Sequence, residues 1–144
     1  MKLQKATLFA LFAVLELARD PSRQVSASEI ADTYGISVNH LAKVLRDLGR
    51  AGLVEAARGA GGGYRFTGNA KRTSLYDVVA LFEDAGDNAG DVLGPAGATD
   101  IGTALASVLR EVDEIKIATF KSISLATLLK ALDRGRVGKP AVVE

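Results

Sequence analysis

Four polar side chains recur at helical spacing in the first half of the chain: Asn39, Lys43, Arg46 and Arg50. At about 100° per residue, they fall within about 60° of one another on a helix. An amide can pair with a base edge, and cations can bind phosphate oxygens. The spacing therefore predicts a surface that binds a nucleic acid.

The opposite face of the same segment is apolar. It is formed by Leu41, Val44, Leu45 and Leu48. We therefore expect one side of this helix to pack and the other to reach outward. A solvated polar face is also common on surface helices, so these residues alone leave both interpretations open. The elements on either side favour contact with DNA.

A short helix with clear boundary signals precedes this segment. Ser26 and Glu29 have the spacing of a capping box, and Gly35 can take the left-handed conformation that ends a helix. Ser37 can cap the next helix. Two short helices joined by a Gly-containing turn predict a helix-turn-helix, whose second helix enters the major groove.

A basic β-hairpin is expected directly after the second helix. Its strands are predicted at residues 53–58 and 64–67, joined by a Gly-rich turn that lets the backbone approach phosphate closely. The hairpin residues that we expect to approach DNA are Arg58, Gly61, Gly62 and Arg65. Two helices followed by such a hairpin predict a winged helix.

The first 80 residues also resemble a known family, the IscR and NsrR group of bacterial winged-helix regulators. The stretches that carry the resemblance are 1–11, 39–44, 51–54, 58–63 and 75–79. The most specific of them is the Arg-Gly-x-x-Gly-Gly wing that follows Ala-Gly-Leu-Val. The resemblance implies a homodimeric transcription factor that reads a pseudo-palindromic operator.

The charge of the chain is distributed unevenly. Its 144 residues carry 18 Lys/Arg and 17 Asp/Glu, enough length for one domain with a short appendage. Residues 1–72 hold 11 of the basic and 6 of the acidic residues, whereas residues 73–144 hold 7 and 11. The positive half contains the predicted helix-turn-helix, as expected of a surface that meets nucleic acid.

The first helix, within residues 1–19, is apolar on nearly all sides. Two lysines followed by this apolar run imitate a signal peptide, but Glu16, Arg19 and Asp20 stand where small cleavage-site residues should follow. The run is also too short to span a bilayer. We therefore expect a cytoplasmic protein with no membrane partner, in which this helix packs on its own domain and on a second subunit.

A second amphipathic helix is expected near the C-terminus. Asp100 can cap a helix that runs from residue 101 to about 122, after another short helix at 74–82. Its apolar positions step by four and three residues, as in a coiled coil. We expect four of them to form a homodimer interface: Leu105, Val108, Val112 and Ile115.

Several kinds of chemistry find no support in the sequence. The chain has no Cys, so the thiolate-held iron-sulfur cluster of the best-known relatives cannot form, and Leu8 stands where some of them place an acidic ligand. His40 is the only histidine and has no Ser/Asp partner at a recognisable spacing. It lies beside the polar face, where it could contact DNA or be an ordinary surface residue. We expect no enzyme activity, metal or cofactor.

The sequence predicts a mainly α-helical protein with a small β-hairpin: a winged helix-turn-helix domain plus a long C-terminal dimerisation helix. The expected divisions are a DNA-binding domain at 1–83, a flexible loop at 84–100, dimerisation and closing helices at 101–134, and a disordered tail at 135–144. The expected DNA-binding residues are Ser37, Asn39, His40, Lys43, Arg46, Arg50, Arg58, Gly61, Gly62 and Arg65.

The function predicted is that of a sequence-specific transcription regulator, a repressor, that binds a double-stranded DNA operator as a homodimer. One alternative stays open: a winged-helix module for protein interaction, whose DNA binding depends on a sensor protein or a small ligand. The basic face favours the first interpretation. Because the chain has no Cys to hold an iron-sulfur cluster, control by a sensor protein or a small ligand stays open as the second interpretation.

Overall fold

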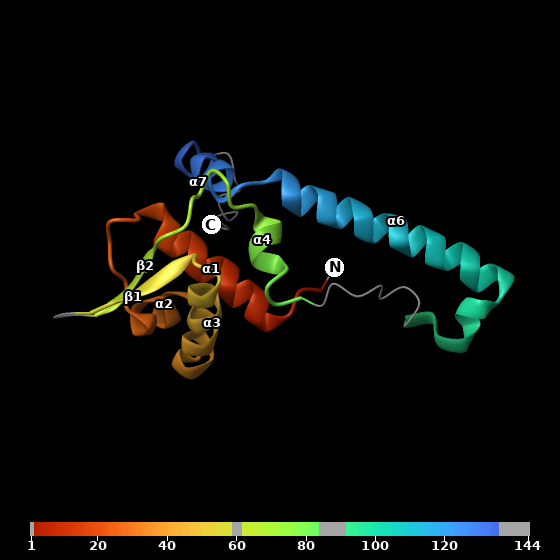
Figure 1. Cartoon of the computed structure of the whole chain (residues 1–144), viewed down its shortest axis with the longest axis horizontal. Coiled ribbons are helices and arrows are strands. Elements are labelled where there is room, and N and C mark those ends of the chain that lie inside the picture. Colours follow the sequence, from red (N-terminus) through yellow and green to blue (C-terminus); the bar gives the residue numbers. More distant parts are fainter. Residues whose placement is uncertain (1, 59–61, 84–91, 136–144) are drawn as a thin grey trace, which may run out of the picture.

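The computed structural model describes residues 2–58, 62–83 and 92–135. A body of short elements carries one long helix that projects from it (Figure 1). The elements are α1 (Lys5–Arg19), α2 (Ala27–Tyr34), α3 (Val38–Arg50), β1 (Val54–Ala57), β2 (Gly63–Phe66), α4 (Leu75–Val79), the 3₁₀ helix η1 (Gly94–Ala98), α6 (Asp100–Ser122) and α7 (Leu125–Asp133). This confirms the predicted fold class.

The boundaries of α2 and α3 follow from their caps. The Ser26 hydroxyl accepts the backbone N–H of Glu29 at 3.0 Å, and Gly35 ends α2 with φ of 66°. Ser37 Oγ accepts the N–H of His40 at 3.4 Å. Only half of the expected capping box is seen, because the Glu29 carboxylate lies 2.9 Å from Arg23 Nη2. A cation within reach competes for the carboxylate that would otherwise turn back to the helix end.

Helix α1 is the centre of the body and contacts α3, α4, β2 and α7. Its fully buried residues include Ala10, Val14 and Leu17. The four apolar residues of α3 that the sequence predicts to pack are all at most 2% exposed. Burial of a Leu or Val side chain contributes about 1.5–3 kcal/mol, so this face holds α3 firmly on α1.

The hairpin is antiparallel, with Val54 opposite Phe66 and Glu55 opposite Arg65. It is joined to the body by a two-way backbone bridge between Val25 and Tyr64, with N···O distances of 2.9 and 2.8 Å. A Cβ at Gly63 would lie 2.8 Å from the Val25 carbonyl carbon. Glycine at this position is therefore what allows the base of the wing to sit so close to the body.

Helix α4 is shorter than the sequence predicts. Ser74 and Asp77 form a full capping box at its start. The helix ends at Val79 rather than near Phe82, and the N–H of Phe82 donates to the Val79 carbonyl at 3.1 Å in a turn. Phe82 nevertheless packs against the core, so its apolar character reflects burial in a turn rather than helical continuation.

The start of α6 differs from the sequence prediction in two ways. Thr99, not Asp100, is the N-cap, and its hydroxyl accepts the N–H of Gly102 at 3.0 Å. The 3₁₀ helix η1 occupies part of the stretch expected to be a flexible loop. Its chain passes so close to Gly102 that a Cβ there would meet the Ala96 carbonyl. Residues 84–91 of that predicted loop, and the tail from 136, lie outside the described residues.

Helix α7 returns to the body, although the sequence analysis groups it with the dimerisation helix. Leu125 is fully buried in the core. The Leu75 N–H donates to the Ile123 carbonyl, and the Leu125 N–H to the Thr73 carbonyl, both at 2.8 Å. The winged-helix body is thus completed by a segment that follows α6.

The four apolar residues of α6 that the sequence predicts to form a dimer interface, which we name the α6 seam, have no cover within the described residues. Leu105, Val108, Val112 and Ile115 are 49, 56, 55 and 60% exposed, and α6 stands away from the body along most of its length (Figure 1). At its C-terminal end, the Lys121 ammonium lies 4.9 Å from the centre of the Tyr76 ring. Among the helices that the structure describes, none has the length and apolar character needed to cross a membrane.

Candidate nucleic-acid interface

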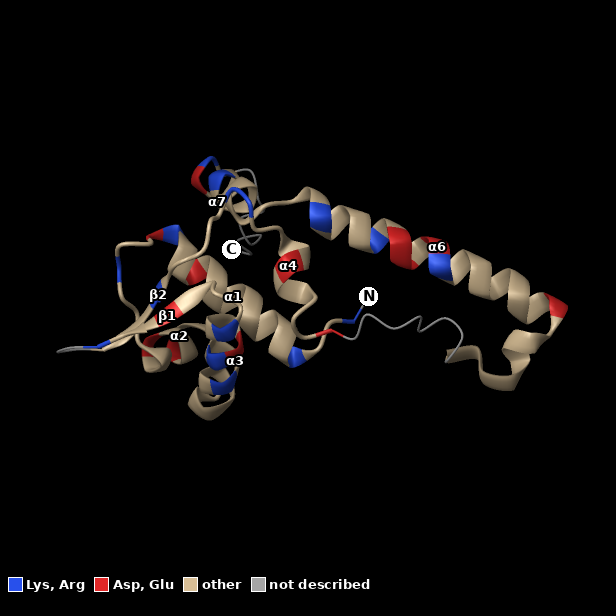
Figure 2. Ribbon diagram, in the orientation of Figure 1, with Lys and Arg blue, Asp and Glu red and all other residues tan. Residues whose placement is uncertain are grey.

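The polar face of α3 is free to contact a partner. Asn39, Lys43, Arg46 and Arg50 are all exposed. Arg50 Nη1 lies 3.6 Å from the Asp47 carboxylate, whereas Lys43 and Arg46 have no ion-pair partner in the described part of the chain. Figure 2 shows basic residues along α3. The structure thus brings together the four polar residues singled out in the sequence, on a helix whose other face is buried.

The two remaining α3 candidates play parts in building the helix. Ser37 is exposed and caps α3. The His40 ring is half-buried against Phe9 of α1, with centroids 4.8 Å apart and planes at 78°. This edge-on contact was missed by the sequence analysis, because helical spacing within α3 says nothing about which α1 residue lies opposite.

The wing contributes Arg58 and Gly62, both exposed at the two described ends of the hairpin loop. Gly61 lies outside the described residues. Arg65 is exposed on the outer face, but its Nη2 lies 2.5 Å from Glu55 Oε1 and its Nε donates to the same oxygen. This pairing partly neutralises the charge of a residue that the sequence predicts to approach DNA. The strand register, which places Glu55 opposite Arg65, could have revealed it.

Helix α2 packs on α1 through an aromatic contact. The rings of Phe12 and Tyr34 stack with centroids 4.8 Å apart. Burial, and then the negative charge of Glu16, raises the pKa of the Tyr34 phenol. The phenol therefore stays protonated near neutral pH and adds no charge to the helix-turn-helix.

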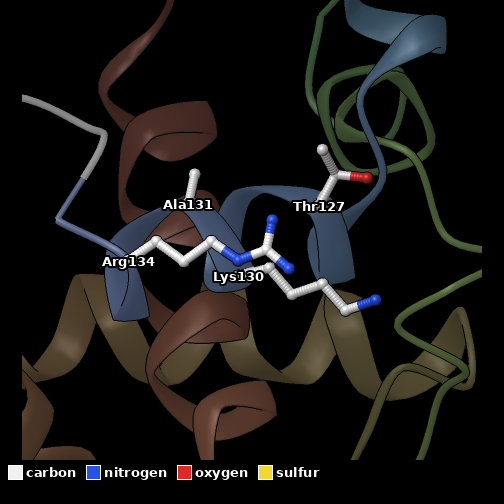
Figure 3. Close-up of a pocket in the computed structure, with 4 residues that line it drawn as sticks. All are labelled: Thr127, Lys130, Ala131 and Arg134. Atoms are coloured by element: carbon white, nitrogen blue, oxygen red, sulfur yellow. The ribbon is translucent and has the colours of Figure 1, made fainter.

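Cofactor sites are poorly supported by the donor atoms present. The chain has no Cys. No group of three His, Asp or Glu side chains that could hold a metal ion occurs in the stretches that the structure describes. A shallow hollow of about 180 Å³ lies on α7 and is lined by Thr127, Lys130, Ala131 and Arg134 (Figure 3).

The chain matches the model of the Rrf2 family, described as iron-dependent transcriptional regulators, over residues 3–131. It is 55% identical over 138 residues to BadM of Rhodopseudomonas palustris, named as an HTH-type transcriptional regulator; the match covers 94% of this chain and 86% of that protein. The fold is similar to T. potens IscR, with a TM-score of 0.76 and 23% identity over 100% of this chain and 97% of that one. It is also similar to oxidized Staphylococcus aureus CymR, with a TM-score of 0.72 and 22% identity over 90% and 97% of the two chains.

Proposed function

The chain belongs to the Rrf2 family of transcriptional regulators, and from that premise we propose that α3 and the wing read a specific DNA operator. The observation that carries this proposal is the difference in burial between the two faces of α3. Its apolar face is locked into the core, while the cations Lys43 and Arg46 stand exposed and unpaired among the described residues. A rigid helix with free donors on one face is suited to the major groove.

The proposed contacts divide into two kinds. Asn39, near the start of α3, is placed to read a base edge, since recognition helices use their N-terminal residues for this purpose. The contacts that we assign to phosphates or the minor groove come from Ser37, Lys43, Arg46, Arg50, Arg58, Gly61, Gly62 and Arg65. Because Glu55 already pairs with Arg65, Arg65 should contribute less than Arg58.

We further propose that the regulator is a homodimer joined through the α6 seam. Exposed apolar residues in a heptad pattern are what a coiled-coil partner covers, and a second copy forms a self-complementary interface. Two copies would place two α3 helices on half-sites about 34 Å apart or more. The proposed site of action is the cytoplasm, and the proposed effect of operator binding is repression.

The residues present do not fit the iron-sulfur cluster that an iron-dependent family description suggests. Such clusters need thiolate ligands, and the chain has no Cys. The single imidazole, His40, packs against Phe9. We therefore propose regulation by a small ligand or a partner protein instead. Adding iron and sulfide should produce no stoichiometric chromophore, and a chelator should leave DNA affinity unchanged; visible absorption from a bound cluster would contradict this.

The alternative function is a protein-interaction module that binds DNA only with a partner. A salt titration distinguishes it from the proposed operator-binding regulator. Fluorescence anisotropy of the purified protein with a random duplex should show affinity that falls steeply between 50 and 200 mM salt. Genomic fragments selected by the protein should then contain an inverted repeat that binds far more tightly than the random duplex. Absence of both results without a partner would favour the alternative.

A further inference from the structure

Thr7 is a polar residue with no solvent exposure in the first turns of α1. Its hydroxyl donates to Oε2 of Glu83, which lies 76 residues further along the chain. A buried hydroxyl without a partner costs about 1–3 kcal/mol, so the position of Glu83 matters to the stability of this helix end.

The same carboxylate also caps α1. Gln4 is the N-cap residue, but its own side chain makes no capping hydrogen bond. Its backbone N–H instead donates to Glu83 Oε2 at 3.3 Å. A negative charge at a helix N-terminus interacts favourably with the helix dipole. Glu83 thus replaces a local cap with one from a distant segment.

Glu83 is itself held by the turn after α4. Its N–H donates to the Val79 carbonyl at 3.0 Å, and the neighbouring Phe82 packs on the core. The carboxylate therefore approaches α1 from a segment anchored to the body.

On its other side, α1 touches the beginning of α3. Phe9, two residues after Thr7, meets the His40 ring edge-on. His40 lies in the first turn of α3, next to Asn39. The backbone of α1 thus joins two contacts, Glu83 with Thr7 and Phe9 with His40, and so links Glu83 to the first turn of the helix proposed to read DNA.

Building on the DNA-binding function proposed above, we infer that Glu83 is a positioning residue for sequence recognition. It fixes the N-terminal end of α1, and Phe9 passes that position to the first turn of α3. Breaking either contact should lower discrimination between operator and random DNA, because base readout depends on placement more strictly than phosphate contact does.

The test measures the affinity of the full chain for two duplexes, one selected by the wild type from genomic fragments and one of random sequence. Glu83→Ala and Phe9→Leu should each lower the operator-to-random affinity ratio by about fivefold, and the double variant should lower it little further. Thr7→Val should lower the affinity ratio in the same way, whereas Thr7→Ser, which keeps the hydroxyl, should retain the wild-type ratio. These two variants also test the inference if Glu83→Ala fails to fold.

Ser124→Ala is the matched control, because it removes a cap from α7 on the same body without touching either contact. It should lower Tm but leave the affinity ratio unchanged. An unchanged ratio in the Glu83 and Thr7 variants, strict additivity in the double variant, or an equal loss in Ser124→Ala would overturn the inference. A wild type that does not discriminate between the two duplexes would instead refute the proposed function on which the inference rests.

Discussion

Helices α3 and α6 are both amphipathic, but α3 exposes only its polar face, whereas α6 exposes its apolar face as well. The apolar face of α3 is covered by the body of the same chain, so its polar face is left for a partner. The apolar face of α6 is uncovered among the described residues, so the second copy that we propose would contact the hydrophobic side. The comparison teaches that burial within one chain indicates which face of a helix is available and what chemistry a partner must bring.

The largest effect is expected from a charge placed in the α6 seam. Val112→Asp would put a carboxylate where we expect apolar contact with a second copy, at a cost of several kcal/mol. The variant should sediment as a monomer at micromolar concentration, and operator affinity should fall by orders of magnitude because the two half-sites no longer act together. Ser107→Asp, off the seam on the same helix, is the control and should stay dimeric. A Val112→Asp variant that remains dimeric would contradict the proposal that the α6 seam forms the dimer interface.

The next effect tests the covered face. Leu45→Ala in α3 should lower the free energy of unfolding by about 2–5 kcal/mol, because it opens a cavity in the core. Leu105→Ala on α6 should cost far less within one chain but should weaken dimerisation. Urea unfolding at several protein concentrations separates the two effects. If both variants lost the same free energy of unfolding at every protein concentration, the proposed contrast between a covered α3 face and an uncovered α6 face would be wrong.

A third prediction concerns the polar face of α3. Asn39→Ala should cost about 1–3 kcal/mol of operator binding and relax the preference at one base position, while leaving binding to random DNA nearly unchanged. Selection of bound sequences from a randomised library measures the change. An identical selected motif would show that Asn39 does not read a base.

The smallest effects are expected in the wing. Arg58→Ala should weaken binding to all duplexes and reduce the salt slope by about one. Arg65→Ala should do less, because Glu55 already shares that charge, and Glu55→Gln should raise affinity slightly by releasing it. Anisotropy at several salt concentrations distinguishes these results. A larger loss for Arg65→Ala than for Arg58→Ala would mean that the ion pair opens on DNA.

Local signals explain what the sequence could predict. The caps at Ser26, Gly35 and Ser37, and the apolar spacing of α3, act within one turn of helix. The prediction that Asp100 caps α6 was wrong, because the adjacent Thr99 is also a good capping residue and is the one that caps the helix.

Contacts between distant segments were out of reach. Three contacts join residues that no periodicity relates: Leu125 with the core, the Glu83 carboxylate with the start of α1, and Phe9 with His40. The Glu55 and Arg65 pair lies between these cases, since an assumed hairpin register would have predicted it. The exposed polar face of α3 was therefore predictable as a set of residues, whereas the contacts that hold the helix in place were not.

The return of α7 to the body has a consequence for synthesis of the protein. Leu125 fills the core only after the whole of α6 has been made, because it follows that helix in the chain. On the ribosome, the apolar α6 seam therefore emerges before the body that carries it is complete. In the order of synthesis, the seam that we propose for dimerisation thus precedes the segment that completes the body proposed to read DNA.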